Sequence, residues 1–547
     1  MIDLKSAPFF LNDEQVAWVQ STRDSLSAKE KVGQLFCVLG NAYDPETLKD
    51  MVAAGKVGGI LYRPVLSCEE IRAAFAPMDA VAKVPLLKAS NLEEGGSGGM
   101  NDGTLFGWPM LTAATDDGEM AEKFGKVCGV EGARAGINWT FSPVCDLEVN
   151  YLNPITNVRT FGSDPQRVKE MTERYVKAIQ NCGVAACAKH FPGDGVDYRD
   201  QHLHPTYNTL SAQDWYDTFG AVYENLIANG LTSVMVGHIA QPNVAKDCNP
   251  DLSFEETMMP ASLSRTLLTD VLRGRYGFNG VITSDAIIMA GYTMAMERRK
   301  AVPAAIMAGC DMLVFSTDFE EDYGYMCSAL ESGLLTMERL DEAVTRVLAL
   351  KAAYCRTFEN EPVPAADWHE QAADKAITLV KQTQPDKLPM TPERYPTIRL
   401  VTLGKDNILH GSVTEISKRI LEENGFRVEI YDPFQDDLHG TADLPADRLT
   451  LYMANCEHAS NQTVVRINWC PKHALDAPRH INEEVCVFVS LANPYHLQDV
   501  PLIRTYVNAY TATETTIRLA IEKLMGKSEF KGVSPVDAFC GLPDTRL

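Results

Sequence analysis

The sequence lacks any apolar run long enough to form a membrane span. Such a helix needs about 20 predominantly apolar residues, and the 547 residues contain no uninterrupted segment of that kind. The first residues, MIDLKSAPFFLNDEQVAWVQ, include acidic side chains and no continuous apolar core, so they do not match a secretory signal. We therefore expect a soluble, cytoplasmic protein with no membrane partner.

Positive charge is also scarce. The 50 Lys and Arg residues are outnumbered by 73 Asp and Glu residues, which gives a formal net charge of −23. A polyanion would be repelled by such a surface, which argues against nucleic acid as a partner. The acidic residues are spread along the chain and are typical of a solvated surface.

Metal-binding and phosphate-binding patterns are missing as well. The 14 cysteines are irregularly spaced, form no CxxC pair and do not combine with histidines at zinc spacing. This pattern is typical of reduced, mostly buried side chains. No glycine-rich phosphate fingerprint follows the first strand of the C-terminal region. We therefore predict no metal and no cofactor.

What the chain does contain is an alternation of short apolar runs and amphipathic helical stretches from residue 30 to about 350. This pattern is typical of parallel β/α units. Eight repeats in about 320 residues fit a (β/α)8 TIM-type barrel better than an open sheet. The candidate strands are 35–39, 57–61, 85–89, 138–142, 184–189, 231–236, 280–284 and 311–315.

A second α/β pattern begins at residue 398, after a Pro-rich, polar stretch. Its runs IRLVTLG, FRVEIYD, LTLYMAN and VCVFVSL alternate with helical segments and predict a smaller, doubly wound α/β sandwich. The predicted organisation is a barrel catalytic domain over 1–360, a helix and linker over 361–397, and an accessory domain over 398–547.

Polar residues gather immediately after the barrel strands. The C-terminal rim of such a barrel carries the active site, so side chains from separate strands are expected to converge there. These residues are Asn91, Glu94, Asp146, Lys189, His190, His238 and Asp285.

The segment 189–205, KHFPGDGVDYRDQHLHP, has the highest density of ionisable groups. Asp200 and His202 are two apart, and in extended backbone both side chains would lie on one side. A carboxylate beside an imidazole fixes the tautomer of the ring and makes a proton shuttle. A metal site is disfavoured because these histidines lie on a Gly/Pro-rich loop. Asp197, Arg199 and His204 are expected to solvate the loop.

Asp285 follows the strand GVITS and precedes an apolar helix start. An aspartate in this position can cap the helix, but Ser284 can do the same, which frees Asp285 to face the site. A carboxylate at a barrel mouth can attack the anomeric carbon of a sugar and form a covalent glycosyl-enzyme.

These segments resemble glycoside hydrolase family 3, and within it the two-domain β-N-acetylhexosaminidase branch. The resemblance covers nearly the whole chain and lies in segments that follow in the family's order. They are LSAKEKVGQLF, FSPVCDL, NPITNVRTFGSDP, KHFPGDG…DQH, VMVGHI, PASLSRTLLTDVLRGRYGFNGVITSD and AGCDML in the first region, and IRLVTLG, VRINW and SLANPYHLQDVPLIRTYVNAY in the second.

The resemblance implies a retaining exo-β-N-acetylhexosaminidase that removes a terminal N-acetylglucosamine. It places the nucleophile at Asp285 and the acid/base dyad at His202 and Asp200. It also implies a carbohydrate substrate; the oligomeric state, monomer or homodimer, is left open. The substrate-binding residues that it implies, or that we expect beside them, are Lys189, His190, Arg159, His238, Asn91, Glu94 and Met289.

Three positions depart from the family pattern. Asp194 replaces the histidine of a Pro-Gly-His-Gly loop, and Gln201 replaces the serine of an Asp-Ser-His dyad. The third motif reads Asn-Leu-Glu-Glu-Gly-Gly from Asn91 instead of Asp-Gln-Glu-Gly-Gly, so Asn91 or Glu94 is expected to bind the sugar.

Other functions are compatible with the same residues. A histidine acid/base could admit phosphate as the acceptor, which would make the chain a phosphorylase. A β-glucosidase of the same family would take its acid/base from a glutamate of the second domain. The departures also leave open an inactive, sugar-binding homologue.

Overall fold

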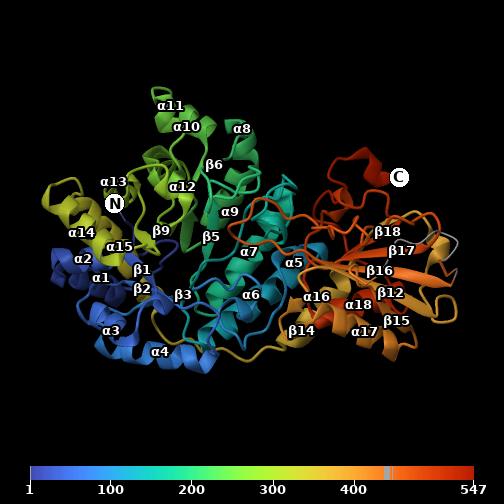
Figure 1. Cartoon of the computed structure of the whole chain (residues 1–547). Helices are drawn as coiled ribbons and strands as arrows, with labels where there is room; N and C mark the ends of the chain where they lie inside the picture. Colours follow the sequence, from blue (N-terminus) through green and yellow to red (C-terminus); the bar gives the residue numbers. More distant parts are fainter. Residues whose placement is uncertain (1, 436–443, 446) are drawn as a thin grey trace. The chain divides into compact units, whose positions relative to one another are not determined.

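The computed structural model describes residues 2–435, 444–445 and 447–547, which form two compact units (Figure 1). The first unit comprises Met1–Phe106, Ala121–Asn150 and Pro165–Ala365. The second comprises Gly107–Met120, Tyr151–Asp164 and Ala366–Leu547. No helix among the described residues is long and apolar enough to cross a membrane.

The first unit contains an eight-stranded sheet in which every neighbouring pair is parallel. Its order is β4-β3-β2-β1-β10-β9-β7-β5. Each of the eight predicted segments overlaps one of these strands. Their bounds are β1 Phe36–Leu39, β2 Gly59–Leu61, β3 Leu87–Ser90, β4 Trp139–Thr140, β5 Cys187–Phe191, β7 Ser233–Val236, β9 Val281–Ala286 and β10 Met312–Val314.

Two isolated parallel bridges join the ends of this sheet. Trp139 of β4 pairs with Ala185, and Val144 pairs with Lys189 of β5. The sheet therefore closes almost completely on itself, and the predicted (β/α)8 barrel is confirmed. Side chains from both faces of its strands are buried, which explains why the strands appear in the sequence as short apolar runs.

Helices cover the outside of the barrel (Figure 1). In α7, apolar residues recur at three- and four-residue spacing from Val168 through Tyr175 to Ile179, and this stripe is buried. The main helices of this unit are α1 Asp13–Ser25, α3 Pro45–Ala53, α4 Cys68–Val81, α6 Gly118–Arg134, α7 Pro165–Asn181, α9 Ala221–Ala228, α13 Arg298–Ala308, α14 Phe319–Glu331 and α15 Met337–Tyr354.

The second unit is built on a six-stranded sheet in the order β11-β18-β17-β16-β12-β15. Only the pair β11 and β18 is antiparallel among these strands. The strands are β11 Thr378–Gln382, β12 Thr397–Gly404, β15 Arg427–Ile430, β16 Arg448–Asn455, β17 Val485–Ser490 and β18 Thr505–Asn508.

Two apolar clusters lie on the two faces of this sheet. One includes residues of α16 (Ala365–Ala376), α17 (Val413–Glu423) and α18 (Glu514–Leu524). The other includes Ile467, Leu475 and Leu497 from less regular segments. The predicted α/β sandwich is thus present. Its first strand and α16 come from the segment 361–397, which was expected to be helix and linker.

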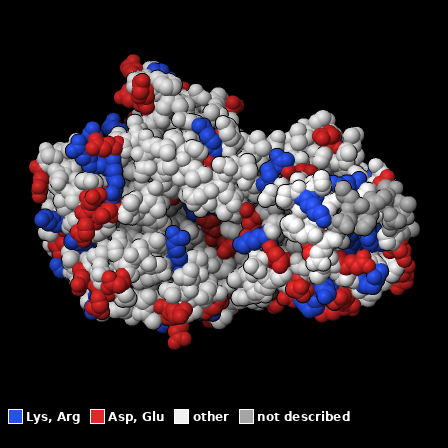
Figure 2. All heavy atoms as spheres, viewed as in Figure 1, with Lys and Arg blue, Asp and Glu red and all other residues white. Residues whose placement is uncertain are grey.

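Charged side chains are scattered over the face that Figure 2 shows, with lysine and arginine interspersed among carboxylates. This distribution is consistent with the interpretation of the negative charge as a solvated surface.

Candidate active site

Asp285 is the penultimate residue of β9, whose first four residues are buried. Its Oδ1 accepts a hydrogen bond from the Ala286 N–H at 2.7 Å, and its side chain keeps 15% exposure. Ser284 is occupied differently, because its hydroxyl accepts a hydrogen bond from the Val314 N–H of β10 at 3.1 Å. Asp285 is therefore the residue that presents a carboxylate at the carboxyl end of the strand.

Three histidines act electrostatically on the Asp285 carboxylate. Burial acts to raise the pKa of Asp285, but His190, His238 and His202 outweigh it, and the net pKa is lowered from 3.8. A carboxyl whose pKa is lowered is ionised at neutral pH. The group therefore meets the first requirement of a nucleophile.

His190 is held by the buried carboxylate of Asp146. Asp146 Oδ2 lies 2.7 Å from His190 Nδ1, and Asp146 Oδ1 accepts the backbone N–H of His190 at 3.0 Å. Because Nδ1 bonds to a carboxylate, it carries the proton, and Nε2 faces Asp285 Oδ2 at 3.9 Å. The sequence identified Asp146 as a strand-end polar residue but did not assign it this role.

Lys189 forms a buried ion pair with Glu93. Its Nζ also lies 3.5 Å from Oδ1 of the exposed Asn91. Glu94 is half-buried, and its backbone carbonyl accepts from the Phe106 N–H at 2.8 Å. The sequence did not single out Glu93. The signal that could have found it is Lys189, because a lysine at a buried strand end needs an anionic partner and Glu93 stands beside Glu94 in the same motif.

Asp200 and His202 form the hydrogen-bonded pair that the sequence predicted. Asp200 Oδ1 lies 2.6 Å from His202 Nδ1 and also accepts the His202 N–H at 2.8 Å. The local backbone is a turn instead of the extended segment that we expected; the turn lets one oxygen accept from both groups. The Asp200 carboxylate is fully buried, whereas the His202 side chain is 27% exposed.

Two of the three departures from the family pattern, Asp194 and Gln201, contact each other. Gln201 Nε2 donates to Asp194 Oδ2 at 3.2 Å, and both side chains are buried. Asp194 in turn donates its backbone N–H to Asp146 Oδ1 at 2.8 Å. The loop that carries the dyad is thus connected to the carboxylate that holds His190.

Elsewhere in this loop, Asp197 is buried and accepts hydrogen bonds from the Arg199 guanidinium and from the Tyr207 N–H. We expected these two charges to solvate the loop. Instead Asp197 and Arg199 pair with each other, and Asp197 also joins this part of the loop to Tyr207.

His238 is fully buried, with both ring nitrogens engaged. Nδ1 lies 2.8 Å from Ser262 Oγ, and Nε2 lies 3.0 Å from the Ala286 carbonyl. Burial lowers its pKa, and Nε2 must donate because a carbonyl can only accept. A sugar contact through this ring would break one of these bonds, and its geometry fits a support for the strand end beside Asp285.

Two other residues that we expected to contact the sugar, Met289 and Arg159, form hydrogen bonds within the protein. Met289 is buried, and its N–H donates to the Ala286 carbonyl at 3.0 Å. Arg159 belongs to the second unit, where Nη1 donates to the Ile155 carbonyl at 3.2 Å.

The site is rich in groups for proton transfer and nucleophilic attack. Among the residues that the structure describes, no group of three or more His, Cys, Asp and Glu side chains is arranged to hold a metal ion. An ionised carboxylate and a carboxylate–imidazole pair at one barrel rim suit a double displacement at an anomeric carbon.

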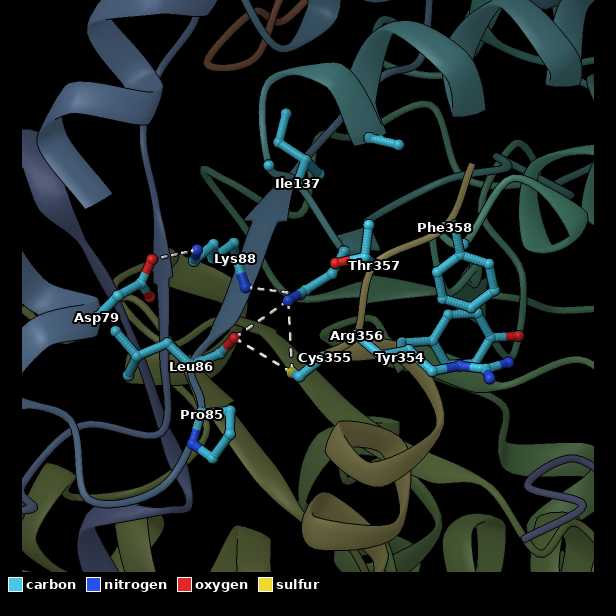
Figure 3. Close-up of a pocket in the computed structure, with 14 residues that line it drawn as sticks. Asp79, Pro85, Leu86, Lys88, Ile137, Tyr354, Cys355, Arg356, Thr357 and Phe358 are labelled. Carbon is cyan, nitrogen blue, oxygen red and sulfur yellow. Dashed lines mark hydrogen bonds and ion pairs between the residues drawn. The ribbon is translucent and has the colours of Figure 1, made fainter. Parts of the chain in front are cut away.

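A separate cavity of about 380 Å³ is lined by residues at or before the starts of β3, β4 and β5 and by residues 354–358 at the end of α15 and beyond it (Figure 3). Figure 3 shows Lys88 directed at Asp79, with Nζ 2.6 Å from Oδ2, and Cys355 beside Leu86, whose carbonyl is 3.4 Å from Sγ. These are amino ends of barrel strands, where side chains support stability and not catalysis. The cavity is therefore distinct from the candidate active site.

Comparisons with known proteins agree with this arrangement. Residues 27–350 match the model of the glycosyl hydrolase family 3 N-terminal domain. The chain is 41% identical over its whole length and the whole length of a "Beta-N-acetylglucosaminidase/beta-glucosidase" from Cellulomonas fimi. It is also 34% identical, over 48% of this chain and 73% of the other, to a "Beta-hexosaminidase" from Chromobacterium violaceum.

Solved structures give the same fold. A structure described as "Beta-glucoside phosphorylase BglX" superposes with a TM-score of 0.93 and 43% identity, covering 99% of each chain. A family 3 β-N-acetylglucosaminidase from Paenibacillus sp. superposes with a TM-score of 0.78 at 23% identity, covering 95% of this chain and all of the other. The chain therefore belongs to glycosyl hydrolase family 3 and is an enzyme of the glycoside hydrolase class.

Proposed function

We propose that the enzyme is a retaining exo-β-N-acetylglucosaminidase that works with Asp285 as nucleophile and His202 as acid/base. The proposal rests on the hydrogen bonds that join the Asp200–His202 turn to the segment that follows Asp285. The backbone carbonyls of Gln201 and His202 accept hydrogen bonds from Gly291 and Ala290, at 3.1 and 3.2 Å, just beyond the nucleophile strand. The relatives named β-hexosaminidase and β-N-acetylglucosaminidase support the choice of sugar.

In the first step, Asp285 attacks the anomeric carbon of the terminal sugar. Oδ1 is engaged by the Ala286 N–H, which leaves Oδ2 to form the new bond as the glycosidic C–O bond breaks. His202 Nε2 gives its proton to the departing oxygen, and the buried Asp200 carboxylate stabilises the imidazolium before transfer.

In the second step, the neutral imidazole accepts a proton from the incoming water. The water oxygen forms a bond to the anomeric carbon, the Asp285–sugar bond breaks, and the β configuration is restored. Lys189, His190, Arg159, Asn91, Glu94 and Met289 remain our proposed sugar-binding residues, with Glu93 added as the ion-pair partner of Lys189.

Trapping the covalent intermediate tests the proposal. A fluorinated N-acetylglucosaminide that forms the glycosyl-enzyme faster than it is released should add the mass of one sugar to the peptide containing Asp285. Asp285→Asn should abolish both labelling and turnover while keeping the thermal transition of the wild type. Labelling of another residue, or turnover by the variant, would refute the assignment.

Phosphorolysis is a second candidate, favoured by the 43% identical structure described as a β-glucoside phosphorylase. An imidazole acid/base adds no negative charge beside the glycosyl-enzyme, so an anionic acceptor is less strongly repelled there than by a second carboxylate. Turnover of N-acetylglucosaminide and glucoside is compared in phosphate and in a phosphate-free buffer. Sugar 1-phosphate as the main product identifies a phosphorylase, and free sugar at an undiminished rate without phosphate identifies a hydrolase.

A further inference from the structure

Gln201, the residue between the two members of the dyad, is itself buried, with 1% of its surface exposed. Three of its polar groups, the two of the side-chain amide and the backbone carbonyl, contact elements outside its own turn. Its Oε1 accepts the His238 N–H at 2.8 Å, its Nε2 donates to Asp194 Oδ2 at 3.2 Å, and its carbonyl accepts the Gly291 N–H at 3.1 Å.

The polarity of these bonds fixes how the amide is oriented. A backbone N–H can only donate, so the atom facing His238 must be the amide oxygen. The amide nitrogen then faces Asp194, whose side chain must accept the hydrogen bond. An ionised carboxylate, which has only acceptors, suits this position. A glutamate at position 201 would keep the first bond and place two carboxylates against each other.

The space around this amide is closed. A Cβ added to Gly237 would lie 3.1 Å from Gln201 Oε1 and 3.2 Å from His190 Cβ, and one added to Gly291 would lie 2.9 Å from the Gln201 carbonyl oxygen. The neighbouring backbone is thus packed tightly against both ends of Gln201. A displaced amide has little room to find an alternative position without moving the turn.

We propose that Gln201, with Asp194 as its partner, is the positioning residue that holds the Asp200–His202 turn where His202 can protonate the leaving group. The chain of contacts runs from Gln201 to Asp194, then to Asp146, which also binds His190 beside Asp285. Hydrogen bonds thereby connect the turn as far as His190, whose Nε2 lies 3.9 Å from Asp285 Oδ2. This inference rests on the proposed roles of Asp285 and His202.

A positioning role predicts a selective defect. Loss of general acid catalysis slows the departure of a poor leaving group much more than that of an activated one, because the activated group leaves without a proton. The parameter to measure is kcat/KM, which reports steps up to cleavage of the glycosidic bond. A residue that merely supports the fold would affect both substrates alike.

The test compares phenyl and 2,4-dinitrophenyl glycosides of the sugar that the enzyme accepts. Gln201→Glu is expected to lower kcat/KM roughly 100-fold for the phenyl glycoside and less than about fivefold for the dinitrophenyl glycoside. The double variant Gln201→Glu with Asp194→Asn is expected to recover most of the loss, because the asparagine amide introduced by the second substitution can donate to the new carboxylate. Gln201→Asn, which stays neutral but is one methylene shorter, is expected to show the same selectivity as Gln201→Glu.

Gln213 offers a matched control. Its Nε2 donates to both carboxylate oxygens of Asp217 at 2.9 Å, but this pair lies on an exposed helix surface. Gln213→Glu makes the same chemical change beside an aspartate and is expected to leave both rates unchanged.

His202→Ala separates the possible failures. If it shows the leaving-group selectivity and the folded Gln201 variants do not, the inference is overturned while the proposed function stands. If it shows no selectivity, the acid/base assignment itself fails. Equal losses on both substrates in the Gln201 variants, or no recovery in the double variant, also overturn the inference.

Discussion

His202 Nδ1 lies 2.6 Å from Oδ1 of Asp200, a carboxylate with no exposed surface. The same oxygen accepts the backbone N–H of His202, so ring and backbone are oriented by one atom. The bond places the proton on Nδ1 of the neutral ring and leaves Nε2 available for the proton transfers that we propose for His202.

Asp200→Asn is expected to lower kcat/KM for a glycoside with a poor leaving group by roughly 10²- to 10⁴-fold. The asparagine oxygen can still accept the His202 N–H, but the negative charge that stabilises the imidazolium is gone. Parallel measurement of the phenyl glycoside and of the thermal transition checks this. An unchanged rate in a folded variant would contradict the role of Asp200.

Asp146 leads to a second prediction, because its two oxygens accept three hydrogen bonds. These come from the N–H groups of His190 and Asp194 and from His190 Nδ1. Asp146→Asn retains one oxygen for the backbone donors, but its amide nitrogen must donate to Nδ1, which forces the other tautomer of His190. The proton then sits on Nε2, facing Asp285.

We expect Asp146→Asn to reduce the free energy of unfolding by about 1–3 kcal/mol and to lower kcat/KM for activated and poor leaving groups alike. The second effect follows because the altered tautomer of His190 acts on Asp285, the proposed nucleophile, and not on His202, the proposed acid. Urea denaturation and the two aryl glycosides measure the effects. Selectivity for the poor leaving group would instead indicate that Asp146 acts mainly through the dyad loop.

The barrel could be predicted because its strands are buried on both faces and therefore appear as apolar runs bounded by turns. β11 was missed for the opposite reason. Its sequence TLVKQ lies at the edge of its sheet and is only partly buried, and it follows directly on a helix in a Pro-rich, polar region. Nothing in a short, half-exposed strand distinguishes it from a connecting segment.

In the active site, the sequence located the strand ends but not the directions of individual side chains. Glu93 and Glu94 are adjacent and chemically identical, and the motif predicts Glu94 as the sugar contact. Leu92 adopts φ 43°, a left-handed conformation that interrupts the alternation of an extended chain. The structure consequently directs Glu93 to Lys189, an outcome that side-chain periodicity cannot give.

The Lys189–Glu93 pair makes a third prediction. Both side chains are more than nine-tenths buried, so removing one charge leaves the other without its partner. Lys189→Met is expected to lower the free energy of unfolding by about 3–5 kcal/mol. Lys189→Met with Glu93→Gln should recover a large part of that loss, because no unpaired charge remains.

Denaturant unfolding of Lys189→Met, of Glu93→Gln and of the double variant gives the coupling free energy between the two side chains directly. Additive effects of the two substitutions would show that the pair contributes no coupling. Activity is expected to stay low in the double variant, since Lys189 is also a proposed sugar contact, and full activity there would remove it from that role.

Lys351 in α15 supplies a prediction about pH. Burial lowers the pKa of Lys351 from 10.5 to about 8, although Cys355 and Cys37 act in the opposite direction. Its Nζ donates to Gln34 Oε1 at 2.6 Å. In the unfolded chain the amine keeps its proton up to its ordinary pKa, so between about pH 8 and 10.5 the unfolded state binds more protons than the folded state.

The contribution of Lys351 to stability must therefore rise with pH across that window. Relative to Lys351→Met, the wild type is expected to gain about 3 kcal/mol between roughly pH 7 and pH 10.5. The comparison is made by urea denaturation at several pH values, because ionisation of tyrosines and cysteines then cancels in the difference. If the free energies of unfolding of wild type and Lys351→Met change with pH in parallel, Lys351 keeps its ordinary titration in the folded enzyme.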